Sequence, residues 1–211
     1  LFENVVNLSN SREALIDLIT IRKQICDWDN YFVDFKSIIK FSNDFEVDDK
    51  NSYMYFEDNP KTHFNLISNF ANKTFKGIKS DFKIEKREIQ GRKIRIGYIS
   101  ADFREHPVTK LIYRSIELHN KEQFEIFAYS IFDEIEDQYT NSIKNSVCKF
   151  VNLSKKNEYD IARTIREDNL DIAIDLMGYS KNSKPKIFAF RVAPNQISYL
   201  VYPETMGSSF M

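Results

Sequence analysis

A chain of 211 residues, 42% of them hydrophobic, is long enough for one α/β domain and a smaller appendage. Its 30 basic and 31 acidic residues give a formal charge of −1, which excludes the basic excess typical of nucleic-acid-binding proteins. No apolar run approaches the roughly 20 residues of a membrane-spanning helix, and two cysteines are too few for a disulfide scaffold. We therefore expect a cytoplasmic protein that binds neither nucleic acid nor a membrane, with Cys26 and Cys148 as small buried residues.

Residues 1–77 carry the three- and four-residue apolar spacing of helices and little strand signal. Asn10 with Glu13 is typical of a helix start, and so is Asn59 with Pro60. These signals predict the first and third of three helices, and a second helix lies between them. Their predicted apolar faces consist of Leu15, Leu18, Ile19, Arg22, Ile25 and Cys26 in the first, Phe32, Phe35, Ile38, Ile39 and Phe41 in the second, and Phe64, Ile67, Phe70 and Phe75 in the third.

A charged, solvated linker at 78–93 separates this helical region from a second domain at 94–211, where strand and helix patterns alternate. Short apolar runs bounded by polar turns are typical of buried parallel strands. Five such runs with helical crossovers predict a doubly wound parallel α/β sheet, because right-handed crossovers place helices on both faces. The predicted strands are Ile94–Ser100, Phe124–Ile131, Lys149–Leu153, Asp171–Leu176 and Gln196–Tyr202, and the predicted helices are Val108–Leu118, 137–147, Glu158–Glu167 and 185–190.

Doubly wound sheets bind ligands at the carboxyl ends of their strands, so the loop after Ser100 is a candidate site. In this loop His106 stands immediately before Pro107, at the amino end of the predicted helix, where the helix dipole suits a proton acceptor. The free amides of the same turn suit an oxyanion or a phosphate. Two interpretations stay open, a catalytic histidine and an ordinary helix cap. We expect Asp102 to form a turn or a cap rather than to act as a general base.

Two more loops follow the strands that end at Leu176 and Tyr202. Gly178 and Tyr179 lie in the first of them, and Pro203 and Thr205 in the second. Such residues are most often structural turn formers. Together with the loop at His106 they could line one cleft, which depends on geometry that a sequence does not contain.

The other histidines favour structural roles. His63 falls in the first turn of a predicted helix, and His119 falls at the end of another, where a positive charge stabilises the helix dipole. Three histidines this dispersed predict no metal site. The strand at Ile94 is not followed by the glycine-rich fingerprint of dinucleotide-binding enzymes, which disfavours a dehydrogenase.

Three segments then occur in a characteristic order. The first reads IGYISADF at 96–103 and continues into His106-Pro107; the second reads DIAIDL-x-GYS at 171–180. The third reads R-x-AP-x-Q at 191–196 and continues into YP-x-T-x-G at 202–207. In order and spacing these segments resemble the O-linked N-acetylglucosamine transferase and SPINDLY family, from about residue 94 to the end. The preceding helices are similar to the family's lead-in between its tetratricopeptide repeats and its catalytic core.

The resemblance implies a Rossmann-like lobe of a two-lobe GT-B glycosyltransferase, cut off before its nucleotide-binding lobe. It implies transfer of N-acetylglucosamine from UDP-GlcNAc to serine or threonine hydroxyls with inversion, and no cofactor or metal beyond the nucleotide sugar. The implied partners are an acceptor protein or peptide and the missing C-terminal lobe. Two alternatives remain open: a GDP-fucose-dependent protein O-fucosyltransferase and a non-catalytic binding relative. Since Leu1 is not an initiator methionine and Phe210-Met211 ends on an apolar pair, we expect a fragment at both ends.

The resemblance also assigns roles to residues. It makes His106 the catalytic group beside the donor sugar and the acceptor hydroxyl. Val201 and Glu204 stand where the family has glycines, and these departures motivate the non-catalytic alternative. The expected donor-sugar pocket consists of Leu200, Val201, Tyr202, Pro203 and Thr205, and the expected supporting loop residues are Asp102, Pro107, Thr109, Gly178 and Tyr179.

Overall fold

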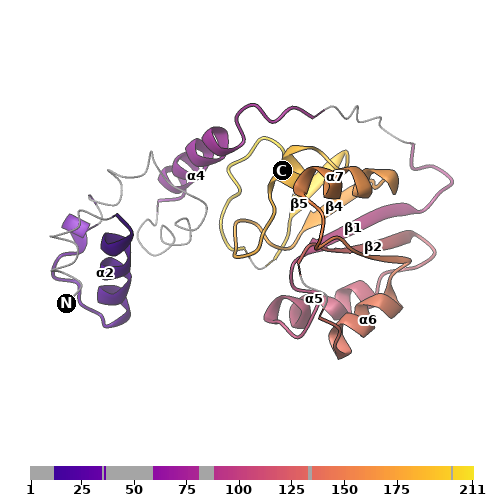
Figure 1. Ribbon diagram of the computed structural model, residues 1–211, viewed down its shortest axis with the longest axis horizontal. Helices are drawn as coiled ribbons and strands as arrows, with labels where there is room; N and C mark the ends of the chain where they lie inside the picture. The colour runs from indigo at the N-terminus through magenta and orange to yellow at the C-terminus, as the bar shows by residue number, and fades with distance from the viewer. Residues whose placement is uncertain (1–11, 35, 37–58, 81–87, 133–134, 201) are drawn as a thin grey trace. The chain divides into compact units, whose positions relative to one another are not determined.

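The computed structural model describes residues 12–34, 36, 59–80, 88–132, 135–200 and 202–211 (Figure 1). The chain divides into two compact units, Leu1–Lys73 and Thr74–Met211. The boundary between them lies close to the end of the predicted helical region. No helix in the described part of the chain is long and apolar enough to cross a membrane.

The first unit contains helices α2 (Arg12–Gln24) and α4 (Pro60–Thr74). The predicted start of α4 is confirmed, because Asn59 Oδ1 accepts hydrogen bonds from the amides of Lys61 at 3.0 Å and Thr62 at 3.3 Å. The proline in the first turn loses no hydrogen bond. Burial of Ile67 and Phe70 confirms part of the predicted apolar face, whereas Phe64 is exposed.

The predicted apolar face of the first helix is only partly correct. Leu18 and Ile19 are buried, but Ile25 and Cys26 are exposed. The helix ends at Gln24, and Cys26 has a left-handed φ of 59°, so both residues lie beyond the helical face that the spacing assumed. Cys148 is exposed as well, so the prediction of two buried cysteines is wrong. Phe32 is also exposed, and the predicted positions Asn10, Phe35, Ile38, Ile39 and Phe41 lie outside the described residues.

The second unit is the predicted doubly wound sheet. All five strands are parallel, in the order β3-β2-β1-β4-β5. Helices α5 and α6 lie on one face of the sheet and α7 on the other (Figure 1). The strands are β1 (Ile94–Ser100), β2 (Phe124–Ser130), β3 (Lys149–Asn152), β4 (Ile172–Asp175) and β5 (Asn195–Ser198), and the helices are α5 (Pro107–Glu117), α6 (Gln138–Ser146), α7 (Glu158–Glu167) and α8 (Lys186–Ala189).

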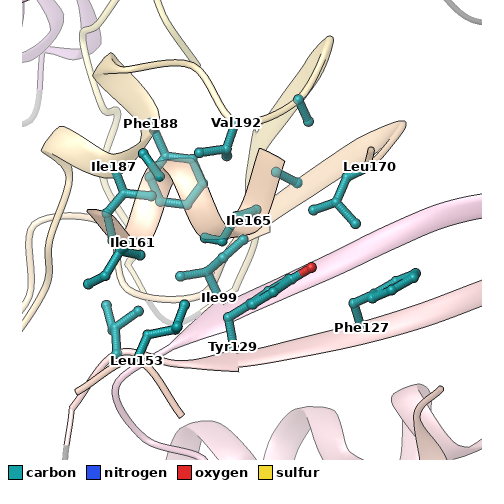
Figure 2. Close-up of a cluster of buried hydrophobic side chains, with 14 of the residues drawn as sticks. Ile99, Phe127, Tyr129, Leu153, Ile161, Ile165, Leu170, Ile187, Phe188 and Val192 are labelled. Atoms are coloured by element: carbon teal, nitrogen blue, oxygen red, sulfur yellow. The ribbon is translucent and has the colours of Figure 1, made fainter. Parts of the chain in front are cut away.

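Each face of the sheet has its own apolar core, because successive side chains of a strand point to opposite faces. Ile99 of β1 and Tyr129 of β2 pack against α7 and α8, as Figure 2 shows. Ile96 and Tyr98 belong to the other core, beneath α5 and α6. Gly97 leaves room for Leu170, whose Cδ1 would lie 2.3 Å from a Cβ at that position. The absence of a side chain there allows the chain before β4 to pack closely on β1.

The last strand is shorter than predicted. The sequence predicts a strand over Gln196–Tyr202, whereas β5 ends at Ser198. Its neighbour β4 ends at Asp175, whose carbonyl accepts the last hydrogen bond of this pair from the amide of Tyr199 at 2.9 Å. Beyond that point the ladder has no partner strand, and the chain turns at Leu200, which has a left-handed φ of 51°. Leu200 and Tyr202 therefore lie beyond the strand, at the carboxyl edge of the sheet.

The amino edge of the sheet is occupied by structural ion pairs. Arg92 donates two hydrogen bonds of 2.6 Å to the two carboxylate oxygens of the buried Asp171, just before β4. The amide of Arg95 in β1 donates to the same carboxylate at 2.8 Å. A bidentate pair of this kind fixes geometry as well as charge. These contacts join the starts of β1 and β4. The candidate site residues lie at the opposite edge, where the strands end.

Candidate functional site

The site is centred on the point where the strand order reverses. From β1 the chain proceeds outward to β2 and β3, then returns to place β4 on the other side of β1. Loops that leave β1 and β4 therefore diverge at their carboxyl ends, and such a switch point is where α/β proteins bind ligands. The two loops are adjacent here, since Ile99 pairs with Asp175 and Ser100 Oγ lies 3.6 Å from Met177 Sδ.

His106 is the amino-terminal cap of α5. Its backbone is extended, with φ −147° and ψ 149°, and Nδ1 accepts a hydrogen bond from the amide of Val108 at 3.3 Å. The same Nδ1 lies 3.5 Å from Asp102 Oδ2, and about a third of the side chain (34%) is exposed. The cap interpretation of this histidine is therefore confirmed. Both of these contacts involve Nδ1 rather than Nε2.

The loop that carries His106 is held rigidly. Asp102 is buried, and its amide donates to Ser100 Oγ at 3.0 Å, which is the turn-forming role expected of it. Thr109 is fully buried, and its hydroxyl donates to the carbonyl of Asp102, which fastens the first turn of α5 to the loop. Pro107 occupies the first helical position and is exposed. Asp102 thus lies beneath the imidazole, while Thr109 and Pro107 fix where the helix begins.

The loop after β4 is organised by a buried carboxylate that the sequence analysis did not single out. Asp175 accepts hydrogen bonds from the amides of Met177 at 2.9 Å and Gly178 at 3.1 Å. Gly178 takes a left-handed φ of 56°, and a Cβ at that position would lie 2.3 Å from Tyr202 Cγ. The ring of Tyr202 therefore rests directly on the backbone of Gly178. A Gly-Tyr pair directly after a strand indicates a tight turn at Gly178. The sequence does not indicate which side chain packs on this glycine.

Tyr179 and Tyr202 complete this structure, which we call the Tyr202 corner and define as Gly178, Tyr179 and Tyr202. The two tyrosine rings pack edge to face with centroids 5.7 Å apart, and the Tyr179 hydroxyl donates to the carbonyl of Met206 at 2.8 Å. The Tyr202 hydroxyl donates to Glu204 Oε2 at 3.0 Å. The structure thus joins the second and third predicted loops into one unit.

The remaining described residues of the expected sugar pocket are the chain neighbours of Tyr202. Leu200 and Pro203 are exposed, and the hydroxyl of Thr205 accepts a hydrogen bond from the amide of Gly207 at 3.1 Å. Val201 lies outside the described residues. The contacts of His106 are with its own loop, and that loop meets the Tyr202 corner through the neighbouring ends of β1 and β4.

The Asp175 carboxyl yields a prediction about pH. Burial raises its pKa to about 7, against the lowering effect of its two amide hydrogen bonds. An unfolded aspartate has a pKa of about 3.9, so the folded state holds a proton that the unfolded state has lost between these values. This contribution to stability is complete below about pH 4 and is lost as the pH rises through about 7.

Asp175→Asn does not titrate, but it replaces one of the two acceptor oxygens with an NH2 group, so we expect a fixed loss of stability against the wild type near pH 4. The variant should become relatively more stable as the pH rises to about 7, by on the order of 4 kcal/mol. Urea unfolding of both proteins across this range measures the difference. A constant difference at every pH would contradict the buried, protonated carboxyl.

The structure corrects the expectation for His119. Its Nε2 lies 2.8 Å from the Tyr98 hydroxyl, and its ring packs against Phe124. Burial lowers the pKa of His119, which opposes the positive charge that the sequence analysis expected at the end of this helix. The structural role itself is confirmed. Among the described residues no three His, Cys, Asp or Glu side chains gather in a metal-ligand cluster.

Comparison with known proteins assigns the family. The family model described as Glycosyl transferase family 41 matches residues 25–211, which is most of the chain. The chain belongs to glycosyl transferase family 41.

Relatives and solved structures agree with this family. A probable UDP-N-acetylglucosamine–peptide N-acetylglucosaminyltransferase SEC of Arabidopsis thaliana is 34% identical over 126 residues, 60% of this chain and 13% of that protein. The UDP-N-acetylglucosamine–peptide N-acetylglucosaminyltransferase of Caenorhabditis elegans is 34% identical over 122 residues, 57% of this chain and 11% of that protein. The family 41 chain thus spans roughly an eighth of the length of these relatives. A mutant O-GlcNAc transferase of Thermobaculum terrenum shares the fold, with a TM-score of 0.75 and 20% identity over 98% of this chain and 40% of that one.

Proposed function

We propose that this chain is the N-terminal catalytic lobe of a protein O-glycosyltransferase that transfers N-acetylglucosamine from UDP-GlcNAc to serine or threonine hydroxyls. The family match over residues 25–211 carries the proposal, and the names of the aligned relatives supply the donor and the peptide acceptor. The switch point between the loops of β1 and β4 supports it, because doubly wound lobes bind their ligands there. A second, nucleotide-binding lobe completes the enzyme.

In the proposed reaction the acceptor hydroxyl attacks the anomeric carbon from the face opposite the leaving group. A new carbon–oxygen bond forms as the bond to the diphosphate breaks, and the diphosphate leaves with the electron pair. Inversion in one step needs no covalent enzyme intermediate. Positioning and electrostatic stabilisation then supply most of the acceleration.

His106 is proposed to receive the hydroxyl proton on Nε2. For Nε2 to accept a proton, the ring must carry its other hydrogen on Nδ1. Asp102 Oδ2, 3.5 Å from Nδ1, is the acceptor placed to hold that hydrogen. In the cap described above Nδ1 accepts the Val108 amide, and the ring then carries its hydrogen on Nε2. Catalysis by Nε2 therefore requires the ring to give up this cap hydrogen bond and to carry its hydrogen on Nδ1. Asp102 is thus proposed as a positioning residue for the imidazole.

The Tyr202 corner is proposed to hold the donor sugar, with Leu200, Val201, Pro203 and Thr205 around it. The exposed Leu200 and Pro203 present apolar surface beside the corner. A non-catalytic relative is the second candidate, and Glu204 favours it, since a carboxylate near a diphosphate opposes binding. The hydrogen bond from the Tyr202 hydroxyl fixes one oxygen of that carboxylate. We further propose a cytoplasmic location, since both cysteines are free and exposed, as suits a reducing compartment.

Incubation of the full-length protein with a serine-containing acceptor peptide and either UDP-GlcNAc or GDP-fucose tests these proposals. Mass spectrometry of the peptide is expected to show addition of N-acetylhexosamine from UDP-GlcNAc. Addition of deoxyhexose from GDP-fucose instead would identify the fucosyltransferase alternative. Absence of transfer and of calorimetric binding with both donors would support the non-catalytic relative.

A further inference from the structure

The second unit begins with a short segment that contacts the Tyr202 corner. Phe75 in this segment lies far from Tyr179 in the sequence, yet the two rings are nearly parallel, with centroids 6.3 Å apart and an interplanar angle of 13°. Phe75 also packs edge to face on Phe210, with centroids 5.0 Å apart. The sequence analysis assigned Phe75 to the apolar face of the third helix, whereas α4 ends at Thr74. The Phe75 ring therefore packs on the α/β lobe and does not belong to that helix.

The backbone of this segment is held on the lobe as well. Gly77 has a left-handed φ of 84°, and the amide of Ile78 donates to the carbonyl of Phe75 at 3.2 Å, so the chain turns directly after the ring. The Ser80 hydroxyl then donates to the carbonyl of Phe190 at 2.7 Å. Phe75 is therefore placed by its backbone and not by its ring contacts alone.

The ring of Phe210, on which Phe75 packs, is itself fixed. Gln196 of β5 is buried, and its Nε2 donates to the carbonyls of Phe210 at 2.5 Å and of Phe188 at 3.0 Å. Arg191 donates from Nη1 to the same Phe210 carbonyl at 3.3 Å. Two side chains thus hold the backbone of Phe210, which gives Phe75 a firm surface to pack on.

Tyr179 connects Phe75 to Tyr202, because its buried ring contacts both. The Tyr179 hydroxyl donates to the carbonyl of Met206, but it lies on the axis about which the ring turns. This hydrogen bond therefore leaves the plane of the ring free, and the last torsion of a tyrosine side chain is soft. The rings that pack on Tyr179 are what set its plane.

We propose that Phe75 is a positioning residue for the donor sugar: it fixes the plane of the Tyr179 ring, against which Tyr202 packs. The inference rests on the proposed transferase function, in which the Tyr202 corner holds the donor. Aromatic pairs favour offset-stacked and edge-to-face geometries, and Tyr179 makes one contact of each kind here. Without the Phe75 ring, Tyr179 can turn, and Tyr202 loses the edge-to-face contact that holds it in the corner.

The test measures steady-state transfer by the full-length protein with UDP-GlcNAc and an acceptor peptide. For Phe75→Ala we expect the KM for UDP-GlcNAc to rise about fivefold, which equals about 1 kcal/mol and is typical of one aromatic pair. The KM for the peptide should stay unchanged. Phe75→Tyr keeps the ring at this half-buried position and should retain the wild-type KM for the donor. Phe75→Leu keeps apolar bulk without the flat ring, and should also raise the donor KM.

Phe124→Ala is the matched control, because it removes another half-buried phenylalanine ring, which packs on His119 at the amino end of β2. This variant should lose stability in urea unfolding and keep the wild-type KM for the donor. Combining Phe75→Ala with Gly178→Ala gives a second readout. Both substitutions act through Tyr202, so together they should raise the donor KM by less than the product of their separate effects.

A wild-type donor KM in both Phe75→Ala and Phe75→Leu, or an equal rise in Phe124→Ala, would overturn the positioning role and leave the transferase function standing. Effects that multiply fully in the double variant would also overturn it. Absence of transfer by the wild type would instead overturn the proposed function itself.

Discussion

Replacing His106 with alanine in the full-length protein is expected to lower the rate of sugar transfer by about 10²–10⁴-fold, the usual contribution of a general acid or base. The expectation follows from the partly exposed imidazole at the switch point, with Asp102 beneath Nδ1. The same substitution also removes the cap of α5 and should cost about 1 kcal/mol of stability. Transfer to a peptide and urea unfolding, measured on the same preparations, separate the two effects.

His106→Asn is the decisive control for this prediction. Asparagine is among the best helix caps, so its side-chain oxygen can accept the Val108 amide that Nδ1 accepts now. The variant should keep wild-type stability and lose transfer as fully as the alanine variant. Near-normal turnover in the asparagine variant would leave His106 as a helix cap and remove it from the mechanism.

Replacing Gly178 with alanine is expected to have the largest effect on the structure of the site. The new Cβ would lie 2.3–2.5 Å from three atoms of Tyr202, and the left-handed φ of 56° is itself unfavourable for alanine. We expect a loss of about 3 kcal/mol in the free energy of unfolding, since overpacking and backbone strain add. The displaced Tyr202 ring should raise the KM for UDP-GlcNAc more than the KM for the acceptor peptide.

Gly91→Ala isolates the backbone contribution. Gly91 also has a left-handed φ, 82°, but a Cβ there would meet nothing within 4 Å. This variant should lose about 1 kcal/mol and keep its KM for the donor. Equal losses of stability in the two variants would show that Tyr202 does not press on Gly178.

The fold was predictable because its signals are local. Apolar runs such as Ile94–Ser100 mark the buried strands, and their alternation with helical patterns specifies a parallel sheet. The end of β5 was not predictable, since it depends on where β4 stops and not on the residues of β5 itself. The exposure of Cys26 was not predicted either, because the helix ends two residues earlier than the apolar spacing suggests.

The candidate site was predictable only as a set of loops. Because doubly wound sheets bind ligands at the carboxyl ends of their strands, the sequence indicates the loops of His106 and Gly178 as candidates. It does not indicate that the ring of Tyr202 packs on Gly178. Asp175 reads as an ordinary strand residue until its burial is known. A pocket of about 230 Å³ at the ends of β1, β2 and β3 beside α6 was not predicted, because no single stretch of sequence contains its walls.

The early end of β5 has a consequence for how this protein can change. Since the ladder stops at Ser198, the segment beyond Leu200 is held by the packing of Tyr202 on Gly178 and by side-chain hydrogen bonds, such as that from the Tyr179 hydroxyl to the Met206 carbonyl, rather than by pairing with β4. Substitutions in it, such as at Glu204, can therefore change the proposed donor site while the sheet beneath stays intact. Evolution can thus vary this short segment independently of the parallel sheet.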